Sequence, residues 1–171
     1  MVNGAEVVAV LNPNIDEAIA YAKKYGLDAY SDFVAFIEKI DVVYIASPHL
    51  THYDYIKRSL LAGKHVLCEI PFTLKKEEAL ELYRLAEEKN LVLMEASKTA
   101  YCPAFGHIVT LIKSGIIGDV VDVKASLSKM VEPPTRELDA EQAGGAMTEH
   151  APLTLMAIIK LLGIDWMDVD F

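Results

Sequence analysis

Short apolar runs recur along the first part of the chain, separated by stretches in which apolar residues return at helical spacing. The runs cover residues 6–11, 41–46, 63–71 and 91–95. Runs that are apolar at nearly every position are typical of parallel strands covered on both faces. Because helical stretches with short connections separate these runs, the pattern predicts a doubly wound parallel sheet of the α/β class.

Capping residues and glycines mark the predicted helices between these runs. Asn14 is placed to cap the first helix, with Glu17 as its capping-box partner, and Gly26 is placed to end it in a left-handed conformation. The other helices predicted in this part of the chain cover residues 31–40, 51–62 and 73–88, the last of them capped by Thr73.

The pattern changes after Pro103. A helix is predicted over residues 105–114, and residues 119–130 alternate apolar and polar side chains as a half-exposed antiparallel strand does. Residues 131–142 are rich in proline and charge and predict an exposed loop. A glycine-rich segment then leads into an apolar helix that ends at Gly163.

Length limits the number of domains. The chain has 171 residues, which suits one ordinary domain and is short for two. We expect residues 1–118 to form most of an α/β domain and residues 119–171 to begin a second domain of the α+β class.

Charge and cysteine content narrow the possible partners and compartments. The 16 basic and 25 acidic side chains give a formal net charge of −9, which argues against nucleic acids and anionic membranes as partners. The two cysteines give no disulfide framework, and neither a membrane-spanning run nor a signal peptide is visible, so a cytoplasmic setting is expected. The histidines do not cluster with cysteines or carboxylates at metal-ligand spacing, so no metal is expected.

Several motifs in order resemble one family. Residues 63–71, GKHVLCEIP, are similar to the GKHVxxEKP signature of the Gfo/Idh/MocA family, named for glucose–fructose oxidoreductase and inositol dehydrogenase. Residues 41–48 followed by His52 resemble its DVVYIATPxxxH strand and turn. Residues 114–118 resemble its linker into the second domain, and residues 144–146 its glycine-rich entry to a long helix. Together, in this order and spacing, they identify the chain as similar to this family.

The resemblance implies a fold, a reaction and a cofactor. The fold would be an incomplete Rossmann-type domain that binds NAD or NADP, followed by the start of a domain for substrate binding and oligomerisation. The reaction would oxidise a secondary hydroxyl, or reduce a ketone, of a sugar, polyol or trans-dihydrodiol. The expected partners are a small sugar-like substrate and further copies of the chain in a homo-oligomer. The alternative is a non-catalytic dinucleotide-binding sensor or interaction protein of the same family.

Missing segments are the first departure from the family pattern. The family's first strand and Gly-x-Gly-x-x-Gly turn, which holds the cofactor pyrophosphate at a helix N-terminus, are not found before Val7. Their absence would leave a gap in the centre of the sheet. The family's second domain also continues well past residue 171. We therefore expect a fragment, truncated at both ends and inactive on its own.

Substitutions at family positions are the second departure. Ile70 replaces the lysine of the family's Glu-Lys-Pro motif, and isoleucine can neither donate a hydrogen bond nor carry charge. Glu149 and Leu153 stand where the family usually has aspartate and then histidine or tyrosine. These three residues favour the non-catalytic alternative.

The expected cofactor-binding residues follow strand ends, where ligands bind in open α/β sheets. Asn12 stands where an acid usually accepts hydrogen bonds from the adenine ribose, and a plain turn-forming role is the equal alternative. Glu69 is expected near the cofactor as a structural hydrogen-bond partner rather than as a general acid. The full set is Asn12, Ser47, Pro48, His52, Glu69 and Pro71.

The expected catalytic residues are Glu149, His150 and Lys98. A histidine beside a carboxylate suits proton transfer to and from a hydroxyl that loses a hydride, although Glu149 and His150 equally fit a polar first helical turn. Lys98 is placed to substitute for the missing lysine, and the alternative is an ordinary exposed lysine. Tyr101 is a further candidate proton donor, with simple packing as its alternative.

Overall fold

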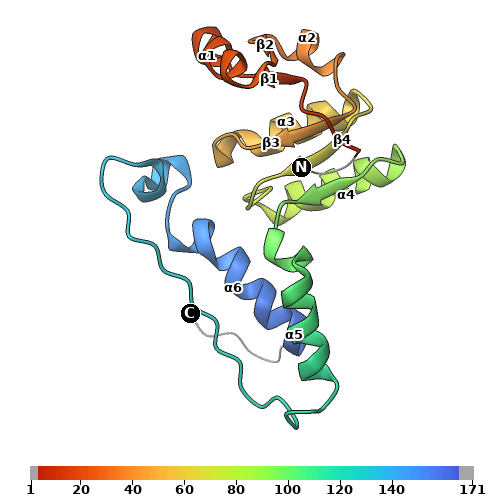
Figure 1. Cartoon of the computed structure of the whole chain (residues 1–171), viewed down its shortest axis with the longest axis vertical. Coiled ribbons are helices and arrows are strands. Elements are labelled where there is room, and N and C mark those ends of the chain that lie inside the picture. Colours follow the sequence, from red (N-terminus) through yellow and green to blue (C-terminus); the bar gives the residue numbers. More distant parts are fainter. Residues whose placement is uncertain (1–3, 166–171) are drawn as a thin grey trace.

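The computed structural model describes residues 4–165 and confirms the α/β class with parallel strands (Figure 1). One sheet has two strands in the order β1-β2, and the other has three in the order β3-β4-β5. All of the pairings are parallel. The strands are β1 (Ala9–Leu11), β2 (Asp28–Tyr30), β3 (Val42–Ile45), β4 (His65–Cys68) and β5 (Leu93–Glu95).

Helices connect the strands and form the lower half of the molecule in Figure 1. The α-helices are α1 (Ile15–Tyr25), α2 (Phe33–Ile37), α3 (His49–Leu61), α4 (Lys76–Glu88), α5 (Pro103–Lys113) and α6 (Ala146–Leu162). The short 3-10 helices are η1 (Lys98–Tyr101), η2 (Arg136–Leu138) and η3 (Ala140–Gln142). Within the described residues, no helix is both long and apolar enough to cross a membrane.

Both predicted ends of α1 are confirmed. The Asn14 side chain accepts a hydrogen bond from the backbone N–H of Asp16 at 3.1 Å, and Gly26 ends the helix with φ of 70°. Glu17 bonds the side-chain amide of Asn14 at 3.0 Å, in place of the backbone N–H that a capping box would use. The local sequence therefore fixes where this helix begins and ends.

Two local expectations need correction. The capping role of Thr73 is wrong, because α4 begins only at Lys76 and its N-cap is Lys75. The Thr73 hydroxyl donates to the carbonyl of Lys75 at 3.4 Å instead. Strand β2 (Asp28–Tyr30) was not expected, because it is short and begins with a charged residue, and its pairing with β1 alone makes it a strand.

The expected antiparallel strand over residues 119–130 is also wrong. The structure describes this segment and gives it no strand, although it runs as an extended stretch beside α6 in Figure 1. Val121, at 94% exposed, shows how open it is. A strand is stabilised when its N–H and C=O groups bond a neighbouring strand. No described segment pairs with this one, so its alternating pattern has no sheet to join.

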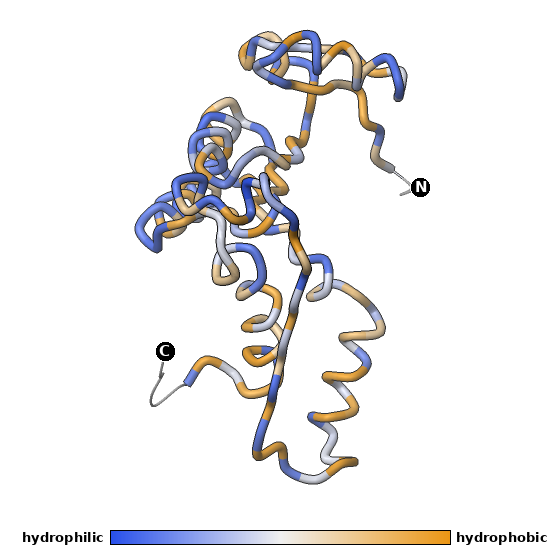
Figure 2. Tube along the Cα trace, turned by 90° about the vertical axis from the view of Figure 1, so that its left-hand side faces the viewer, coloured by the Kyte–Doolittle hydropathy of each residue, from blue (hydrophilic) through white to orange (hydrophobic). Residues whose placement is uncertain are grey.

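The fully buried core lies in the first part of the chain. It gathers one face of β3 and β4 with the inner faces of α2, α3 and α4, and its members are Phe36, Ile37, Ile40, Val43, Ile45, Ile56, Leu60, Val66, Cys68, Leu82 and Ala86. Residues 98–165 contain no fully buried side chain, although α5 and α6 carry many apolar residues (Figure 2). The rigid support for any site therefore comes from β3, β4 and β5.

The two sheets remain separate. Strands β1 and β3 are sheet edges, and no backbone hydrogen bond joins them within the described residues. On β3 the side chains of Val42 and Tyr44 are 56% and 57% exposed, whereas Val43 and Ile45 are buried. One face of β3 is therefore open, in keeping with the expected interruption in the centre of the sheet.

Candidate functional site

The carboxyl ends of β3, β4 and β5 meet at one edge of the sheet. The register places Ile45 opposite Cys68, and Cys68 opposite Glu95. The segments that follow these residues, 46–48, 69–71 and 96–98, therefore leave the sheet side by side. Ligands of open α/β sheets bind at such an edge.

The side chain of His52 contacts two of these segments from the protein interior. Its ring is fully buried, with Nδ1 2.8 Å from the carbonyl oxygen of Pro71 and Nε2 2.8 Å from that of Ser47. Both carbonyls can only accept hydrogen bonds, and an imidazole with one N–H donates to only one of them. The ring lies between the loops after β3 and β4 and keeps them at a fixed separation. His52 thus shapes the edge from inside rather than facing outward.

The turn into α3 is closed by hydroxyl groups. Ser47 Oγ lies 2.6 Å from Thr51 Oγ1, and Thr51 Oγ1 donates to the carbonyl of Pro48 at 2.7 Å. Pro48 is the N-cap residue of α3 and has no side-chain donor or acceptor of its own. The two predicted residues Ser47 and Pro48 are therefore held on the rim of the edge by local hydrogen bonds.

Glu69 at the end of β4 is bonded to a neighbouring strand. It accepts a short hydrogen bond from the hydroxyl of Tyr44, and this bond, together with burial, raises the pKa of Tyr44 to about 12. Glu69 is therefore positioned as a hydrogen-bond partner, which is the role expected for it. Beside it, burial raises the pKa of the Cys68 thiol to about 12, so this cysteine is an inert core residue.

A charged cluster forms where α6 approaches the sheet edge. The guanidinium of Arg136 donates to Glu149 through two nitrogens, at 2.9 Å to Oε1 and 3.4 Å to Oε2. His49 Nε2 lies 2.9 Å from Glu149 Oε1. Within the described residues, the bond between His49 and Glu149 is the side-chain hydrogen bond that joins residues 4–97 to residues 98–165. Glu149 therefore links the sheet edge to the second part of the chain.

Gly144 explains how Arg136 reaches Glu149. A Cβ atom at Gly144 would lie 2.4 Å from the carbonyl oxygen of Arg136, so only glycine allows this approach. The backbone N–H of Gly145 donates to the carbonyl of Glu137 at 2.9 Å and fixes the same contact. The glycine-rich entry to α6 thus brings the loop carrying Arg136 against the first turn of the helix.

Burial and hydrogen bonds set the charges in this cluster. Burial opposes ionisation of Glu149, but hydrogen bonds from Arg136 and His49 outweigh it and lower the pKa of the carboxyl. Burial lowers the pKa of His49, and the hydrogen bond to Glu149 offsets this only in part. Near neutral pH, Glu149 is therefore an anion and His49 a neutral ring. Because a carboxylate only accepts, the His49 proton sits on Nε2.

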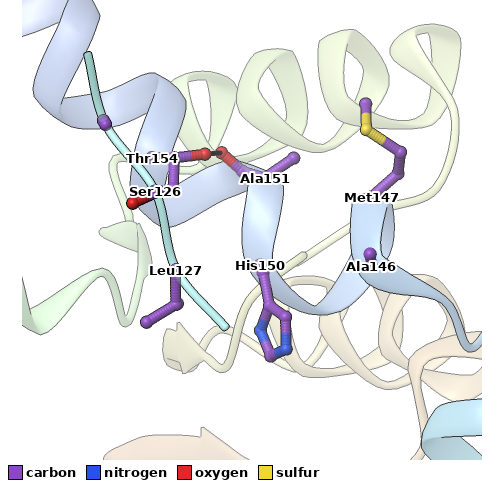
Figure 3. A pocket seen from close by; sticks show the side chains of 8 residues that line it. Ser126, Leu127, Ala146, Met147, His150, Ala151 and Thr154 are labelled. Atoms are coloured by element: carbon purple, nitrogen blue, oxygen red, sulfur yellow. Dashed lines mark hydrogen bonds between the residues drawn. The ribbon is translucent and has the colours of Figure 1, made fainter. Parts of the chain in front are cut away.

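His150 points away from this cluster. Its ring lines a pocket of about 240 Å³ between α6 and residues 125–127, together with Met147 and Thr154 (Figure 3). Glu149 instead bonds Arg136 and His49. The structure therefore does not bring the predicted pair of Glu149 and His150 together, because neighbouring residues on a helix point about 100° apart.

The remaining predicted residues lie in different surroundings. Lys98 is exposed in η1, and its side chain makes no hydrogen bond or ion pair within the described residues. Asn12 accepts from the backbone N–H of Asn14 at 2.8 Å and donates to Glu17 at 2.9 Å, which supports its turn-forming role. Tyr101 is 60% exposed. Within residues 4–165, no three or more His, Cys, Asp or Glu side chains are grouped to hold a metal ion.

Sequence reasoning missed His49, Ser97 and Arg136. His49 follows Ser47-Pro48 directly after a strand, and Ser97 follows the strand that ends at Glu95, so position after a strand end was an available signal. Arg136 lies in a loop that is polar throughout, and only the packing against Gly144 reveals its role.

Comparison with known families gives a match over more than half of the chain. The profile of the Gfo/Idh/MocA family, described as an oxidoreductase family with an NAD-binding Rossmann fold, matches residues 1–97. These residues include β1 to β5 and the segments that form the sheet edge.

Two curated relatives are about 30% identical to the chain over the aligned residues. It is 30% identical over 166 residues to dTDP-3,4-didehydro-2,6-dideoxy-alpha-D-glucose 3-reductase of Actinomadura kijaniata, covering 94% of this chain and 49% of the relative. It is 31% identical over 147 residues to trans-1,2-dihydrobenzene-1,2-diol dehydrogenase of Xenopus laevis, covering 84% and 44%. The chain thus spans about half the length of these relatives.

Solved structures show the same fold. KijD10, a 3-ketoreductase from Actinomadura kijaniata solved in complex with NADP, is 32% identical with a TM-score of 0.62, covering 67% of this chain and 37% of that one. A structure from Bordetella bronchiseptica RB50 has a TM-score of 0.76 and 24% identity, covering 94% and 44%. At that identity, the second likeness concerns the fold alone.

The buried bonds of His52 lead to a first prediction. In His52→Phe the carbonyls of Ser47 and Pro71 lose the polar ring between them and its N–H donor in the interior, so the free energy of unfolding should fall by roughly 2–4 kcal/mol. Chemical denaturation measures the loss. His107→Phe, at an exposed position, is the matched control and should change stability little. Equal losses of unfolding free energy in the two variants would show that the His52 ring does not stabilise the two loops.

The lowered pKa of Glu149 leads to a second prediction. Because the folded-state pKa lies below the ordinary value of 4.5, ionised Glu149 stabilises the fold above that pH and the gain is lost on further acidification. Near neutral pH, Glu149→Gln should lower the free energy of unfolding by about 1–3 kcal/mol. The gap between wild type and variant should close as the pH falls through the folded-state pKa. The exposed Glu88→Gln is the control, and a gap that stays constant with pH would contradict the assignment.

Proposed function

Because the chain belongs to the Gfo/Idh/MocA family of oxidoreductases with an NAD-binding Rossmann fold, we propose that it is part of an NAD(P)-dependent oxidoreductase. Residues 1–118 would supply the cofactor-binding domain, and residues 119–171 the beginning of a domain for substrate binding and oligomerisation. The reaction would interconvert a secondary hydroxyl and a ketone on a sugar, polyol or trans-dihydrodiol. The names of the two curated relatives, a sugar-nucleotide reductase and a dihydrodiol dehydrogenase, support this class.

One observation carries the proposal. The segments at residues 46–52, 69–71 and 96–98 lie together at the carboxyl edge of one parallel sheet, and the first two resemble family motifs. A buried imidazole fixes two of them at that edge. A rigid loop framework at this end of a parallel sheet is what dinucleotide-binding folds use to position a ligand.

Part of the cofactor fits the residues that are present. The nicotinamide end would lie at the edge formed by Ser47, Pro48, Glu69 and Pro71, behind which His52 acts as a positioning residue. Buried polar atoms without partners lie at the same edge, as a ligand site requires. Asn12 would approach the adenine ribose, and its uncharged side chain would not repel a 2′-phosphate, so either NAD or NADP suits the site.

The pyrophosphate has a weaker fit. The 171 residues contain no Gly-x-Gly-x-x-Gly turn, and such a turn supplies the backbone N–H groups that hold pyrophosphate in Rossmann folds. The separate sheets leave β1 and β3 as unpaired edges among the described residues. The chain alone should therefore bind the cofactor mainly through its nicotinamide and ribose portions, and weakly.

The chain's own residues would manage the proton of the reaction. When bound, the cofactor supplies or accepts the hydride. Glu149, held as an anion by Arg136, would orient the substrate hydroxyl at the sheet edge. Lys98 and His150 are the candidates for moving the proton, since no hydrogen bond or ion pair occupies either side chain within the described residues.

Two substitutions favour a second candidate function. Ile70 and Leu153 replace residues that the family uses near the reacting hydroxyl, and both are half-buried hydrocarbon side chains here. The retained sheet edge would serve binding alone equally well. A non-catalytic dinucleotide-binding sensor or interaction protein therefore remains the alternative.

Compartment and assembly complete the proposal. Cys68 and Cys102 are both free, which suits a reducing cytoplasm. Apolar side chains on the second part of the chain, such as Val121 and Met130, are more than nine-tenths exposed, which suits burial in a homo-oligomer. The partners would thus be a sugar-like small molecule and further copies of the chain.

Cofactor binding is the direct test. We expect the 171-residue chain to bind NADH with a dissociation constant well above one micromolar, because the pyrophosphate grip is missing. NMR titration measures affinities in this range. No detectable binding of NADH or NADPH would overturn the proposed function. A sub-micromolar dissociation constant would instead contradict the expectation that the chain binds the pyrophosphate only weakly.

Turnover separates the two candidate functions. Because the 171-residue chain is expected to be inactive on its own, the assay uses the full-length protein, and oxidation or formation of NAD(P)H is followed by absorbance with a panel of sugars, sugar nucleotides and dihydrodiols. We expect Ile70→Lys to raise turnover on at least one of them by about tenfold or more, because it restores a cationic donor beside the reacting oxygen. Ile70→Met is the control for side-chain volume without charge. Cofactor binding without turnover in both wild type and Ile70→Lys would favour the sensor.

A further inference from the structure

Two buried side-chain atoms among the described residues have no hydrogen-bond partner. They are Nδ1 of His49 and Oγ of Ser97. His49 is 7% exposed and Ser97 is 9% exposed. Buried polar side-chain atoms in folded proteins nearly always have a partner, so each of these atoms requires an explanation.

Both atoms belong to the same edge of the sheet. His49 is the first residue of α3, four positions after β3 ends at Ile45, and Ser97 comes two positions after β5 ends at Glu95. Strand β4 lies between β3 and β5. Neighbouring strands are about 4.8 Å apart, so the ends of β3 and β5 are separated by about 10 Å. The two residues thus follow strands that flank the same central strand.

Hydrogen-bonding chemistry limits what can occupy the position beside His49. The Nε2 proton points to Glu149, so Nδ1 carries a lone pair and can only accept. The charge of the Glu149 carboxylate is offset by its pairing with Arg136, so the main requirement at Nδ1 is a hydrogen-bond donor. Hydroxyl groups and a carboxamide N–H are the neutral donors that a sugar or a nicotinamide riboside carries. Ser97 Oγ can donate or accept and sets no further limit.

We propose that His49 Nδ1 and Ser97 Oγ form a ligand subsite that binds the hydroxyl or carboxamide groups of a neutral ring. This inference rests on the proposed function and assigns a role to two residues beyond the expected site residues. The ring is either the nicotinamide and its ribose or the sugar-like substrate, since both carry such groups. The ligand would provide the hydrogen-bond partners that the protein itself does not offer these two atoms.

Removal of the serine hydroxyl separates a ligand group from a structural one. Ser97→Ala replaces an unbonded buried hydroxyl with a methyl group, so the melting temperature of the free protein should rise, by about 2–4 °C for a chain of this size. Ligand affinity should fall about three- to tenfold in the same variant. A structural serine would show the opposite sign, with a lower melting temperature and unchanged affinity.

Two substitutions of His49 separate its two nitrogens. Gln places an amide nitrogen near the Nε2 position and keeps the bond to Glu149, whereas Asn places its oxygen near the Nδ1 position and loses that bond. We expect His49→Gln to weaken ligand binding about tenfold, and His49→Asn to stay within about threefold of wild type. Equal effects of both variants on affinity would show that Nδ1 has no special role.

Three probes identify the ring. NADH, ADP-ribose and dTDP-glucose are titrated by NMR into wild type and Ser97→Ala. Weaker binding of NADH with unchanged ADP-ribose assigns the subsite to the nicotinamide base, because ADP-ribose retains the ribose next to it. Equal weakening of NADH and ADP-ribose assigns the subsite to that ribose, and weaker binding of dTDP-glucose alone assigns it to the sugar. If the wild type binds a probe and every Ser97 and His49 variant binds it with the same affinity, the subsite is wrong but the proposed function stands. Wild type that binds no probe overturns the proposed function and the subsite with it.

Discussion

The sheet edge depends on one buried ring. Parallel pairing brings the ends of β3, β4 and β5 together, but it does not determine how the chain leaves each strand. His52 does so, because its two nitrogens lie 2.8 Å from the carbonyls of Ser47 and Pro71. Loops that carry binding groups are otherwise among the least stable parts of a fold. With the imidazole inside, two of these loops share the rigidity of the core that Ile56 and Leu60 form beneath them.

Charge balance at Glu149 is the second constraint, and it bears on the missing lysine. A carboxylate that is 13% exposed is costly unless it is paired. The family has a lysine in its Glu-Lys-Pro motif, and this chain has Ile70 at that position. Among the described residues, Arg136 supplies the cation that pairs with Glu149, and His49 supplies a neutral donor. Glu149 therefore stays ionised, and Gly144 is the residue whose missing Cβ makes the pairing with Arg136 possible.

The sequence predicted most of the fold and only part of the site. Strands β1, β3, β4 and β5 were predictable because apolar runs of strand length suit a buried parallel sheet, and Asn14 capped its helix as expected. Local pattern failed where tertiary contacts decide: β2 is a strand only through β1, and residues 119–130 alternate correctly yet have no described partner. The pairing of Glu149 with His49 could not be predicted, because 100 residues separate them.

The position of the core explains why the sheet edge and the charged cluster around Glu149 are fixed in different ways. Side chains held by β3, β4, α3 and α4 rest on fully buried neighbours, whereas residues 98–165 have none. His49 and Ser97 are thus fixed by the sheet, and Glu149 is fixed only through its partners in the charged cluster. A ligand that bonds His49 Nδ1 also stabilises the tautomer that donates to Glu149, since the ring then has a partner at each nitrogen. Ligand binding at the sheet edge and attachment of α6 to that edge should therefore reinforce each other, because both act through one imidazole.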